Sequence, residues 1–375
     1  MNDDYPPIYH NVCPREIEMI RDMVRKNPVK TPNAYEAFDD DKDSAFIIKP
    51  AGIWLQMTCK TPPAKMLFDK FWFEEELCIL FADTNAGKSI LAVQIGDSIS
   101  RGEHISGFET EAAPATVLYF DFELTDKQFK TRYHQPGYDE YKFSPNFLRA
   151  VFNPSSNRAR KFSTFQEYIS NEIENAIINT KAKVLIIDNL TCLRYDTYAI
   201  TGALNLIHCL QSLKSRYGLS ILVLAHTPKR NPLKPITRND LQGSKMLINF
   251  CDSAFAIGES QTVPGQRYIK QIKQRSIGET YGAEKVCLCN IIKHYNFLQF
   301  DFSGHDHEAA HLASYTEQHR KANEARIAEL NKQGLSIRQI AARINGSTTT
   351  VFRVLKRLEV DEKESNQKES TLEFI

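Results

Sequence analysis

The sequence predicts an α/β fold with a mostly parallel sheet, followed by a small all-α domain near the C-terminal end. Three observations carry this prediction. Apolar runs of strand length alternate with helical patterns between residues 54 and 302, and the first four runs are apolar on both faces, as buried parallel strands must be. A glycine-containing loop joins the first of these strands to an amphipathic helix. A basic segment with helical periodicity follows residue 318.

Length and composition exclude several classes of protein. The chain has 375 residues, more than one ordinary domain core holds, with 42% hydrophobic and 25% charged residues, a balance typical of a soluble globular protein. No run of 18 apolar residues occurs, so we expect no membrane-spanning helix and no membrane partner. The N-terminus lacks an apolar signal segment and the 8 cysteines form no C-x-x-C pair, so we expect a reducing cytoplasm.

The pattern divides the chain into five regions. We expect an N-terminal extension at 1–53, a core at 54–302, a linker without periodicity at 303–318, a helical domain at 319–360 and a charged tail at 361–375. The extension is predicted to contain a helix over Pro14–Arg25. The strands expected in the core are Leu77–Phe81, Thr116–Phe120, Val184–Ile187, Ile221–Leu224, Ser253–Ile257, Arg267–Lys273 and Val286–Ile292.

The most informative segment is the loop between the first strand and the helix that starts at Ile90. Backbone N–H groups of such a loop wrap phosphate oxygens, and the helix N-terminus adds a favourable partial charge. The pattern G-x-x-x-x-G-K-[ST] is met except at its first position, where alanine stands. An incidental glycine-lysine-serine is the alternative, which the strand before and the helix after disfavour. We expect Lys88 to reach the β- and γ-phosphates and Ser89 to ligate Mg²⁺. The expected nucleotide-binding residues are Ala82, Asp83, Thr84, Asn85, Ala86, Gly87, Lys88, Ser89 and Ile90.

The next three strands end in residues that suit phosphate chemistry. Asp188 ends the third strand, where a carboxylate holds Mg²⁺ behind a phosphate loop. Asp121 and Glu123 follow the second strand, share a face by period-two alternation, and provide a candidate general base. His226 follows the fourth strand, where its side chain can sense the γ-phosphate. The alternatives are a loop-capping aspartate, a solvated strand end and a structural histidine.

The order of these motifs resembles the RecA-type ATPases, most of all the branch with the hexameric plasmid replicative helicase RepA and its AAA_25 relatives. The resemblance spans roughly Phe71 to Phe300. It implies a RecA-like P-loop NTPase core, ATP as the nucleotide and Mg²⁺ as the metal. In that branch the catalytic glutamate follows the strand after the phosphate-loop helix, which corresponds to Glu123. The metal-binding aspartate corresponds to Asp188 and the strand-end histidine to His226.

Two further segments are similar to this family. Asp240–Lys245 is similar to the polar loop that lines the DNA channel of the ring. Arg267–Arg275 resembles the strand that carries a K-x-R finger in DnaB-like helicases, which implies that Lys273 and Arg275 reach the nucleotide of a neighbouring subunit. A basic edge strand that discourages aggregation is the alternative. The family comparison does not explain the proline-containing loop Lys229–Asn239.

The segment from Arg326 to Leu358 predicts a unit of three helices. Ser336 is the expected N-cap of a helix at Ile337–Ile344, and a tight turn leads to a last helix. The pattern resembles a resolvase-type helix-turn-helix, whose last helix enters the major groove. Between Arg320 and Leu358 the sequence has nine Lys and Arg but only two Asp and Glu, as phosphate contacts demand. A domain for protein contacts is the alternative. The residues expected to face DNA are Thr349, Thr350, Arg353, Lys356 and Arg357, the first three of them as base readers.

These features together predict an oligomeric ATPase that acts on DNA. The resemblance implies a homo-oligomer, most simply a hexameric ring, with single-stranded DNA in its channel and duplex DNA at the helix-turn-helix. A replicative helicase, or a helicase-like initiation factor of a plasmid or mobile element, is the leading interpretation. The alternatives are an ATP-switched regulator of recombination or transposition, and a transcriptional regulator. The extension at 1–53 has no motif, and we hypothesise that it is a subunit-exchange arm.

Overall fold

The computed structural model describes residues 46–59, 61–189, 199–228, 230–241, 245–312, 317–344 and 346–358. The chain forms two compact units, Met1–Pro63 and Ala64–Ile375, so the boundary lies after Pro63 rather than after the expected residue 53. The described part of the first unit contains helix α2 (Ala51–Thr58). The helix expected at Pro14–Arg25 and the tail expected at 361–375 lie outside the described residues.

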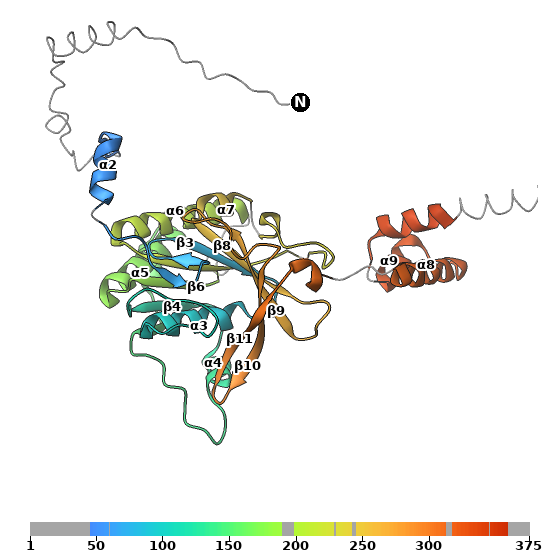
Figure 1. Cartoon of the computed structure of the whole chain (residues 1–375), viewed down its shortest axis with the longest axis horizontal. Helices are drawn as coiled ribbons and strands as arrows, with labels where there is room; N and C mark the ends of the chain where they lie inside the picture. The colour runs from blue at the N-terminus through green and yellow to red at the C-terminus, as the bar shows by residue number, and fades with distance from the viewer. Residues whose placement is uncertain are drawn as a thin grey trace, which may run out of the picture. The chain divides into compact units, whose positions relative to one another are not determined.

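A nine-stranded sheet forms the centre of the second unit, in the order β11-β10-β9-β8-β3-β7-β6-β4-β5 (Figure 1). The strands from β8 to β5 run parallel, and β9, β10 and β11 continue the sheet antiparallel. This confirms the predicted mostly parallel α/β fold. The strands are β3 (Leu77–Ala82), β4 (Val117–Asp121), β5 (Phe147–Ala150), β6 (Val184–Asp188), β7 (Ser220–His226), β8 (Ser253–Glu259), β9 (Gln266–Lys273), β10 (Val286–His294) and β11 (Phe297–Asp306). A small hairpin, β1 (Met66–Phe68) and β2 (Trp72–Phe73), precedes them.

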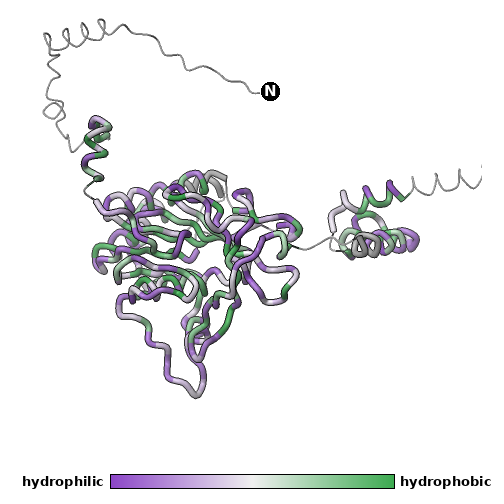
Figure 2. Tube along the Cα trace, viewed as in Figure 1, coloured by the Kyte–Doolittle hydropathy of each residue, from purple (hydrophilic) through white to green (hydrophobic). Residues whose placement is uncertain are grey.

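Helices cover both faces of the parallel strands, which explains why these strands are apolar throughout. Helix α3 (Lys88–Arg101) packs on one face, and α5 (Phe165–Thr180), α6 (Ala199–Tyr217) and α7 (Lys245–Phe250) pack on the other (Figure 1). Every residue of β3, β4 and β6 is buried, and hydrophobic residues run along the centre of the sheet (Figure 2). No helix in the described part of the chain has the length and apolar character needed to cross a membrane.

The β10–β11 hairpin folds back over α3 and α4 (Asp126–Tyr133). The Gln94 side chain on α3 bonds both the backbone N–H and the carbonyl of Phe300, at 2.8 and 3.0 Å. Lys293 donates to the carbonyls of Thr131 and His134 at the end of α4, each at 2.7 Å. The sequence analysis missed β11, because its alternation of apolar and polar residues is interrupted. The hairpin therefore braces the two helices that follow the phosphate loop and the second parallel strand.

The linker expected at 303–318 is wrong for residues 303–311. Strand β11 continues to Asp306, and a 3₁₀ helix, η4 (Glu308–His311), follows. Glu308 is buried, forms an ion pair with Lys270 on β9 and accepts a hydrogen bond from Ile236 N at 2.7 Å. Lys270 also donates to Ile236 O at 2.8 Å. Paired charges can be buried without an apolar pattern, so the sequence of this segment gives no sign of its burial.

The C-terminal end forms the predicted three helices, α8 (Glu317–Lys332), α9 (Ile337–Arg343) and a helix at 348–358. Ser336 is the N-cap residue of α9 as expected, and its backbone N–H and its hydroxyl both donate to Gln339 Oε1, each at 2.9 Å. A small separate core joins the three helices. Its buried members are Ile327, Leu330, Ile340, Ala341 and Val351.

We predict that Glu308→Gln lowers the free energy of unfolding of the core by about 3 kcal/mol, because Lys270 would stay buried without a counter-charge. Urea denaturation followed by the fluorescence of the buried Trp72 measures this loss. The control is Glu284→Gln, which removes an exposed contact to His307 and should change stability by less than about 0.5 kcal/mol. Equal effects of the two variants would contradict the prediction.

Candidate functional site

The loop after β3 has the backbone of a phosphate-binding loop. Gly87, just before α3, has φ +102°, in the left-handed region that favours glycine. A Cβ at Gly87 would lie 2.8 Å from side-chain atoms of Ile291 and Phe300 on the hairpin, so a larger residue would require these side chains to move. Helix α3 begins with no side-chain cap. Its N-terminus is therefore available to an anion.

Ala82 departs from the glycine of the pattern, and the structure explains why alanine is tolerated. Ala82 is the last residue of β3 and pairs with His226 on β7 and Ile257 on β8. Its backbone is ordinary strand, outside the left-handed region. A Cβ therefore adds no strain, and the departure does not weaken the phosphate loop.

The Lys88 ammonium lies over the carbonyls of its own loop. Its Nζ donates to Ala82 O and Asp83 O, each at 3.0 Å, and lies 3.2 Å from His226 Nδ1. Burial lowers the pKa of Lys88 below its usual value, and the nearby carboxylates of Asp188 and Glu123 act in the opposite sense. A phosphate group at the loop would replace neutral carbonyls with a charged partner for this lysine.

Asp188, at the end of β6, is completely buried beside the start of α3. Tyr119 on β4 donates its hydroxyl to Asp188 Oδ2 at 2.6 Å. Burial raises the pKa of Asp188 to about 6, although the neighbouring hydroxyls of Ser89 and Tyr119 lower it in part. Oδ1 is buried and has no hydrogen-bond partner among the described residues. An incompletely paired carboxylate near the Ser89 hydroxyl fits the oxygen ligands that Mg²⁺ prefers.

Glu123 and His226 meet beside the phosphate loop. Glu123 Oε1 lies 3.4 Å from His226 Nε2, and the other ring nitrogen faces Lys88. Asn189, directly after Asp188, contacts both of them: its Nδ2 donates to Glu123 Oε1 and lies 2.9 Å from His226 Nε2. His226 thus connects the lysine of the loop to the acid that follows the second strand.

The expectation that Asp121 and Glu123 share a face is wrong. Strand β4 ends at Asp121, and the bend after it sends the two carboxylates apart. Asp121 is buried, accepts hydrogen bonds from the backbone of Glu123 and Leu124, and pairs with Arg149 at 2.9 Å. Of the two acids, Asp121 therefore shapes the turn and Glu123 lines the cavity.

Lys88, Glu123 and His226 line one cavity of about 220 Å³. This cavity is smaller than a pocket that encloses a drug-sized ligand, and its size suits the phosphates of a nucleotide. Its lining residues are Thr84, Asn85, Gly87, Lys88, Ser89, Ile90, Glu123, Arg132 and His226.

Sequence reasoning missed Tyr119, Asn189 and Arg132. Arg132 lies in the last turn of α4, and its Nη1 is buried without a hydrogen-bond partner among the described residues. Asn189 follows a strand-end aspartate, a signal that could have identified it. Tyr119 and Arg132 carry no such signal, because their places depend on how β4 and α4 pack.

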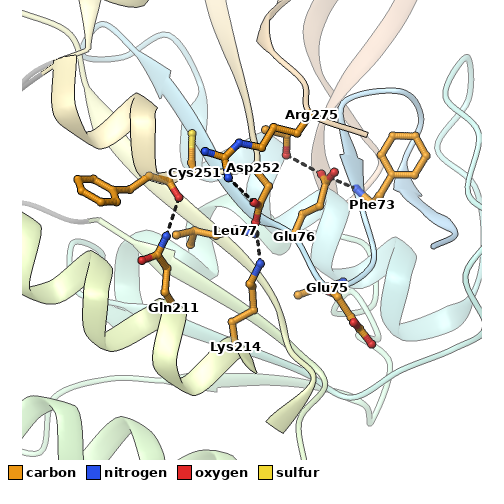
Figure 3. Close-up of polar contacts among 12 residues, drawn as sticks. Phe73, Glu75, Glu76, Leu77, Gln211, Lys214, Cys251, Asp252 and Arg275 are labelled. Atoms are coloured by element: carbon orange, nitrogen blue, oxygen red, sulfur yellow. Dashed lines mark hydrogen bonds and ion pairs between the residues drawn. The ribbon is translucent and has the colours of Figure 1, made fainter. Parts of the chain in front are cut away.

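Lys273 and Arg275, the two expected finger residues, lie near the amino ends of the parallel strands, opposite the end that carries the phosphate loop. Arg275 donates to Asp252 Oδ1 at 3.2 Å and to Asn249 O at 2.7 Å, and Asp252 also accepts from Lys214 and from Leu77 N (Figure 3). Leu77 begins β3 and the phosphate loop follows its end, about 17 Å away at the usual rise per residue. Arg275 therefore lies far from the phosphate loop of its own subunit.

The structure also separates Lys273 from Arg275. Lys273 donates to three carbonyls, those of Ile248, Asn249 and Cys251, and burial lowers its pKa. It therefore closes the C-terminal end of α7. Arg275 keeps more than half of its side chain exposed. Of the two cations, only Arg275 is placed to reach another molecule.

The expected channel loop is described only in part, because residues 242–244 lie outside the described residues. The proline-containing loop before it is anchored at Ile236, whose N–H and carbonyl bond Glu308 and Lys270. Thr237 caps the short 3₁₀ helix η3 (Arg238–Asp240). The loop after the His226 strand is therefore fixed at its far end.

All five residues expected to face DNA are exposed on the 348–358 helix. Two of them have partners: the Thr350 hydroxyl lies 2.8 Å from Ser347 Oγ, at the helix N-terminus, and Arg357 pairs with Glu324 on α8. Within the described residues, Thr349, Arg353 and Lys356 make no hydrogen bond or ion pair, so their side chains are available to a ligand.

We predict that Asp188→Asn raises the melting temperature of the nucleotide-free protein at about pH 8 and changes it little at about pH 5. The pKa of Asp188 in the folded chain, about 6, lies above the value of an exposed aspartate. Its protonated form therefore favours folding, and that contribution is lost as the pH rises through 6. Thermal unfolding at both pH values measures the effect. The exposed Asp139→Asn should show no such difference, and equal shifts at the two pH values for Asp188→Asn would contradict the prediction.

Comparison with known families agrees with this geometry. Residues 53–232 match the model of an AAA domain, AAA_25, and residues 323–358 match the model of a helix-turn-helix domain. None of the curated proteins compared with the chain matches it. The first match contains the phosphate loop, Glu123, Asp188 and His226, and the second contains α9 and the 348–358 helix. The two domains indicate a DNA-associated ATPase. The chain therefore combines an AAA_25-type P-loop ATPase domain with a C-terminal helix-turn-helix domain.

Proposed function

We propose that this protein is an oligomeric, Mg²⁺-dependent ATPase that moves on DNA, as a RepA-like replicative helicase or a helicase-like initiation factor of a plasmid or mobile element. One spatial arrangement carries the proposal. Lys88, Glu123 and His226 converge at one edge of the sheet, and the exposed Arg275 lies at the opposite edge. An arginine that cannot reach its own subunit's site is placed to serve the next subunit in a head-to-tail ring.

Residues of one subunit would bind and activate ATP. Lys88 would exchange its contacts with Ala82 O and Asp83 O for the β- and γ-phosphates. Glu123, held by Asn189, would accept the proton of the attacking water. Ser89 and Asp188 would hold Mg²⁺, which when bound offsets negative charge on the phosphates.

The neighbouring subunit would complete the site with Arg275. A guanidinium beside the γ-phosphoryl group stabilises the charge of the transition state, so hydrolysis would require assembly. Asp252 supports this role, because it holds Arg275 at the start of β3 and is itself fixed by Lys214 and Leu77 N (Figure 3). Lys273 does not fit the role of a finger, because its ammonium donates to three backbone carbonyls.

A second function is an ATP-switched regulator of recombination, transposition or transcription. The observation that favours it is the helix-turn-helix with its unpaired Thr349 and Arg353, since a processive motor has little need to hold one site. Unwinding of a forked duplex would favour the helicase. A footprint on a defined duplex that is unchanged in Lys88→Ala would favour the transcriptional regulator.

We predict that ATP turnover per subunit rises with protein concentration and with single-stranded DNA. The reason is that each ATP site needs an arginine from a second subunit, and the channel needs a single strand of DNA to act on. Steady-state phosphate release, without DNA, with single-stranded DNA or with duplex, measures it, and Lys88→Ala supplies the blank. Turnover that is independent of protein concentration would contradict assembly, and no turnover in any condition would leave a nucleotide-binding switch.

We predict that Arg275→Ala lowers turnover roughly a thousandfold and leaves ATP binding intact. Mixing Arg275→Ala with Lys88→Ala should restore activity. In an equal mixture about a quarter of the interfaces join an intact phosphate loop to an intact Arg275 of the other subunit. Phosphate release from the mixture measures the recovery. Lys214→Met is the matched control at the same cluster, and should keep most of the turnover because Arg275 stays paired. A mixture as inactive as its components would show that Arg275 does not act between subunits.

A further inference from the structure

One stripe of the 348–358 helix is exposed and faces away from the small core. Thr349, Phe352, Arg353 and Lys356 are spaced by three, four and seven residues, which places them on one face of a helix. Val351 is completely buried on the opposite side. The three polar members are residues that the sequence predicts to face DNA, and Phe352 is a further member that only the structure adds.

Phe352 is the large apolar member of this stripe, and 53% of its surface is exposed. It is not part of the small core that joins α8, α9 and the 348–358 helix. A phenylalanine ring that is half in water gives up part of the stabilisation that its burial would provide. A contact with another molecule would bury it.

The charge around Phe352 indicates what that molecule is. The neighbours on the stripe are two cations, Arg353 and Lys356, and the whole helix at 348–358 contains no Asp or Glu. Arg357 is set apart, because it pairs with Glu324. Within the described residues, neither Arg353 nor Lys356 is paired with an acid. An apolar ring beside two unpaired cations suits a polyanion that also presents apolar groups. A purely apolar protein groove would leave these cations without partners.

The major groove of DNA has this combination of groups. Phosphates line its rims, and each thymine presents a 5-methyl group at its floor, which apolar side chains contact. The second helix of a helix-turn-helix enters this groove with its N-terminal residues toward the bases. Phe352 lies in the second turn of the helix, one turn after Thr349 and directly before Arg353, with Lys356 one turn further on.

We propose that Phe352 reads the 5-methyl group of a thymine in the major groove, and so determines sequence preference beside Thr349 and Arg353. This inference rests on the proposed binding of duplex DNA by the helix-turn-helix. It adds to that proposal the chemical group that is recognised and the side chain that recognises it.

The first test is selection from a pool of randomised duplexes with the full-length chain. The wild type should enrich a motif with at least one strongly preferred T·A pair, and Phe352→Ala should lose preference at that pair alone. Arg353→Ala is the matched control: it should weaken binding or relax a different position, and keep the thymine. Thermal unfolding should match the wild type for Phe352→Ala, because the side chain is exposed.

The second test removes a single methyl group from the DNA. Deoxyuridine in place of the preferred thymine keeps every hydrogen-bonding group, so it isolates the methyl contact. The wild type should bind the substituted duplex about fourfold more weakly, the effect expected for one buried methyl group. Phe352→Ala should bind the two duplexes equally.

Several outcomes would overturn the inference and leave duplex binding in place. These are a thymine preference that survives in Phe352→Ala, deoxyuridine without effect on the wild type, or wild-type binding to duplexes with no base preference. A Phe352→Ala variant with unchanged DNA binding and a changed oligomeric mass would assign the ring to a contact between copies of the chain, and overturns it also. If the wild type retains no duplex at all, the proposed role of the helix-turn-helix fails as well.

Discussion

The hydrogen bond from Leu77 N to Asp252 fixes the start of β3, and the functional groups of the core depend on where this strand is held. β3 is buried along its whole length and pairs with β7 on one side and β8 on the other. Its end supplies the phosphate loop, and its start meets the carboxylate that holds Arg275. A strand bonded on both sides moves as one body with its neighbours. The proposed ATP site of a subunit and the arginine that it would offer to the next are therefore joined by one rigid element.

Burial of charge serves two different purposes in this core. Lys270 and Glu308 neutralise each other and fix the backbone at Ile236, so the pair is structural. Lys88 and Asp188 are buried with incomplete compensation of their charges. Burial lowers the pKa of Lys88 and raises that of Asp188, so it favours the neutral form of each. Lys88 lines the small cavity, and Asp188 is buried close enough to act on its charge. Incompletely compensated groups gathered at one place are typical of functional sites. They also explain why a bound nucleotide with its metal would stabilise this edge of the sheet.

The helix-turn-helix domain adds a second, basic surface to the ATPase core. Its buried residues are few, and its surface is basic on the 348–358 helix. Phosphate contacts from such a surface give affinity without sequence preference, whereas contacts to base edges give preference. Within the described residues, the exposed Phe352 and the unpaired Arg353 are the side chains proposed for the second kind of contact.

The sequence by itself determined the parallel core, the phosphate loop at 82–89 and the helix-turn-helix, because each depends on local order: apolar runs of strand length, a glycine before a lysine, and helical periodicity. It also placed acids and a histidine at strand ends, and parallel strands bring those ends to one edge. Only the tertiary structure separated Glu123 from Asp121, since the bend after β4 sends one to the cavity and the other to Arg149. It alone brought Arg132 to the phosphate loop and buried Glu308 against Lys270. Those contacts join residues distant in sequence or set the direction of a side chain, and a one-dimensional pattern holds no record of either.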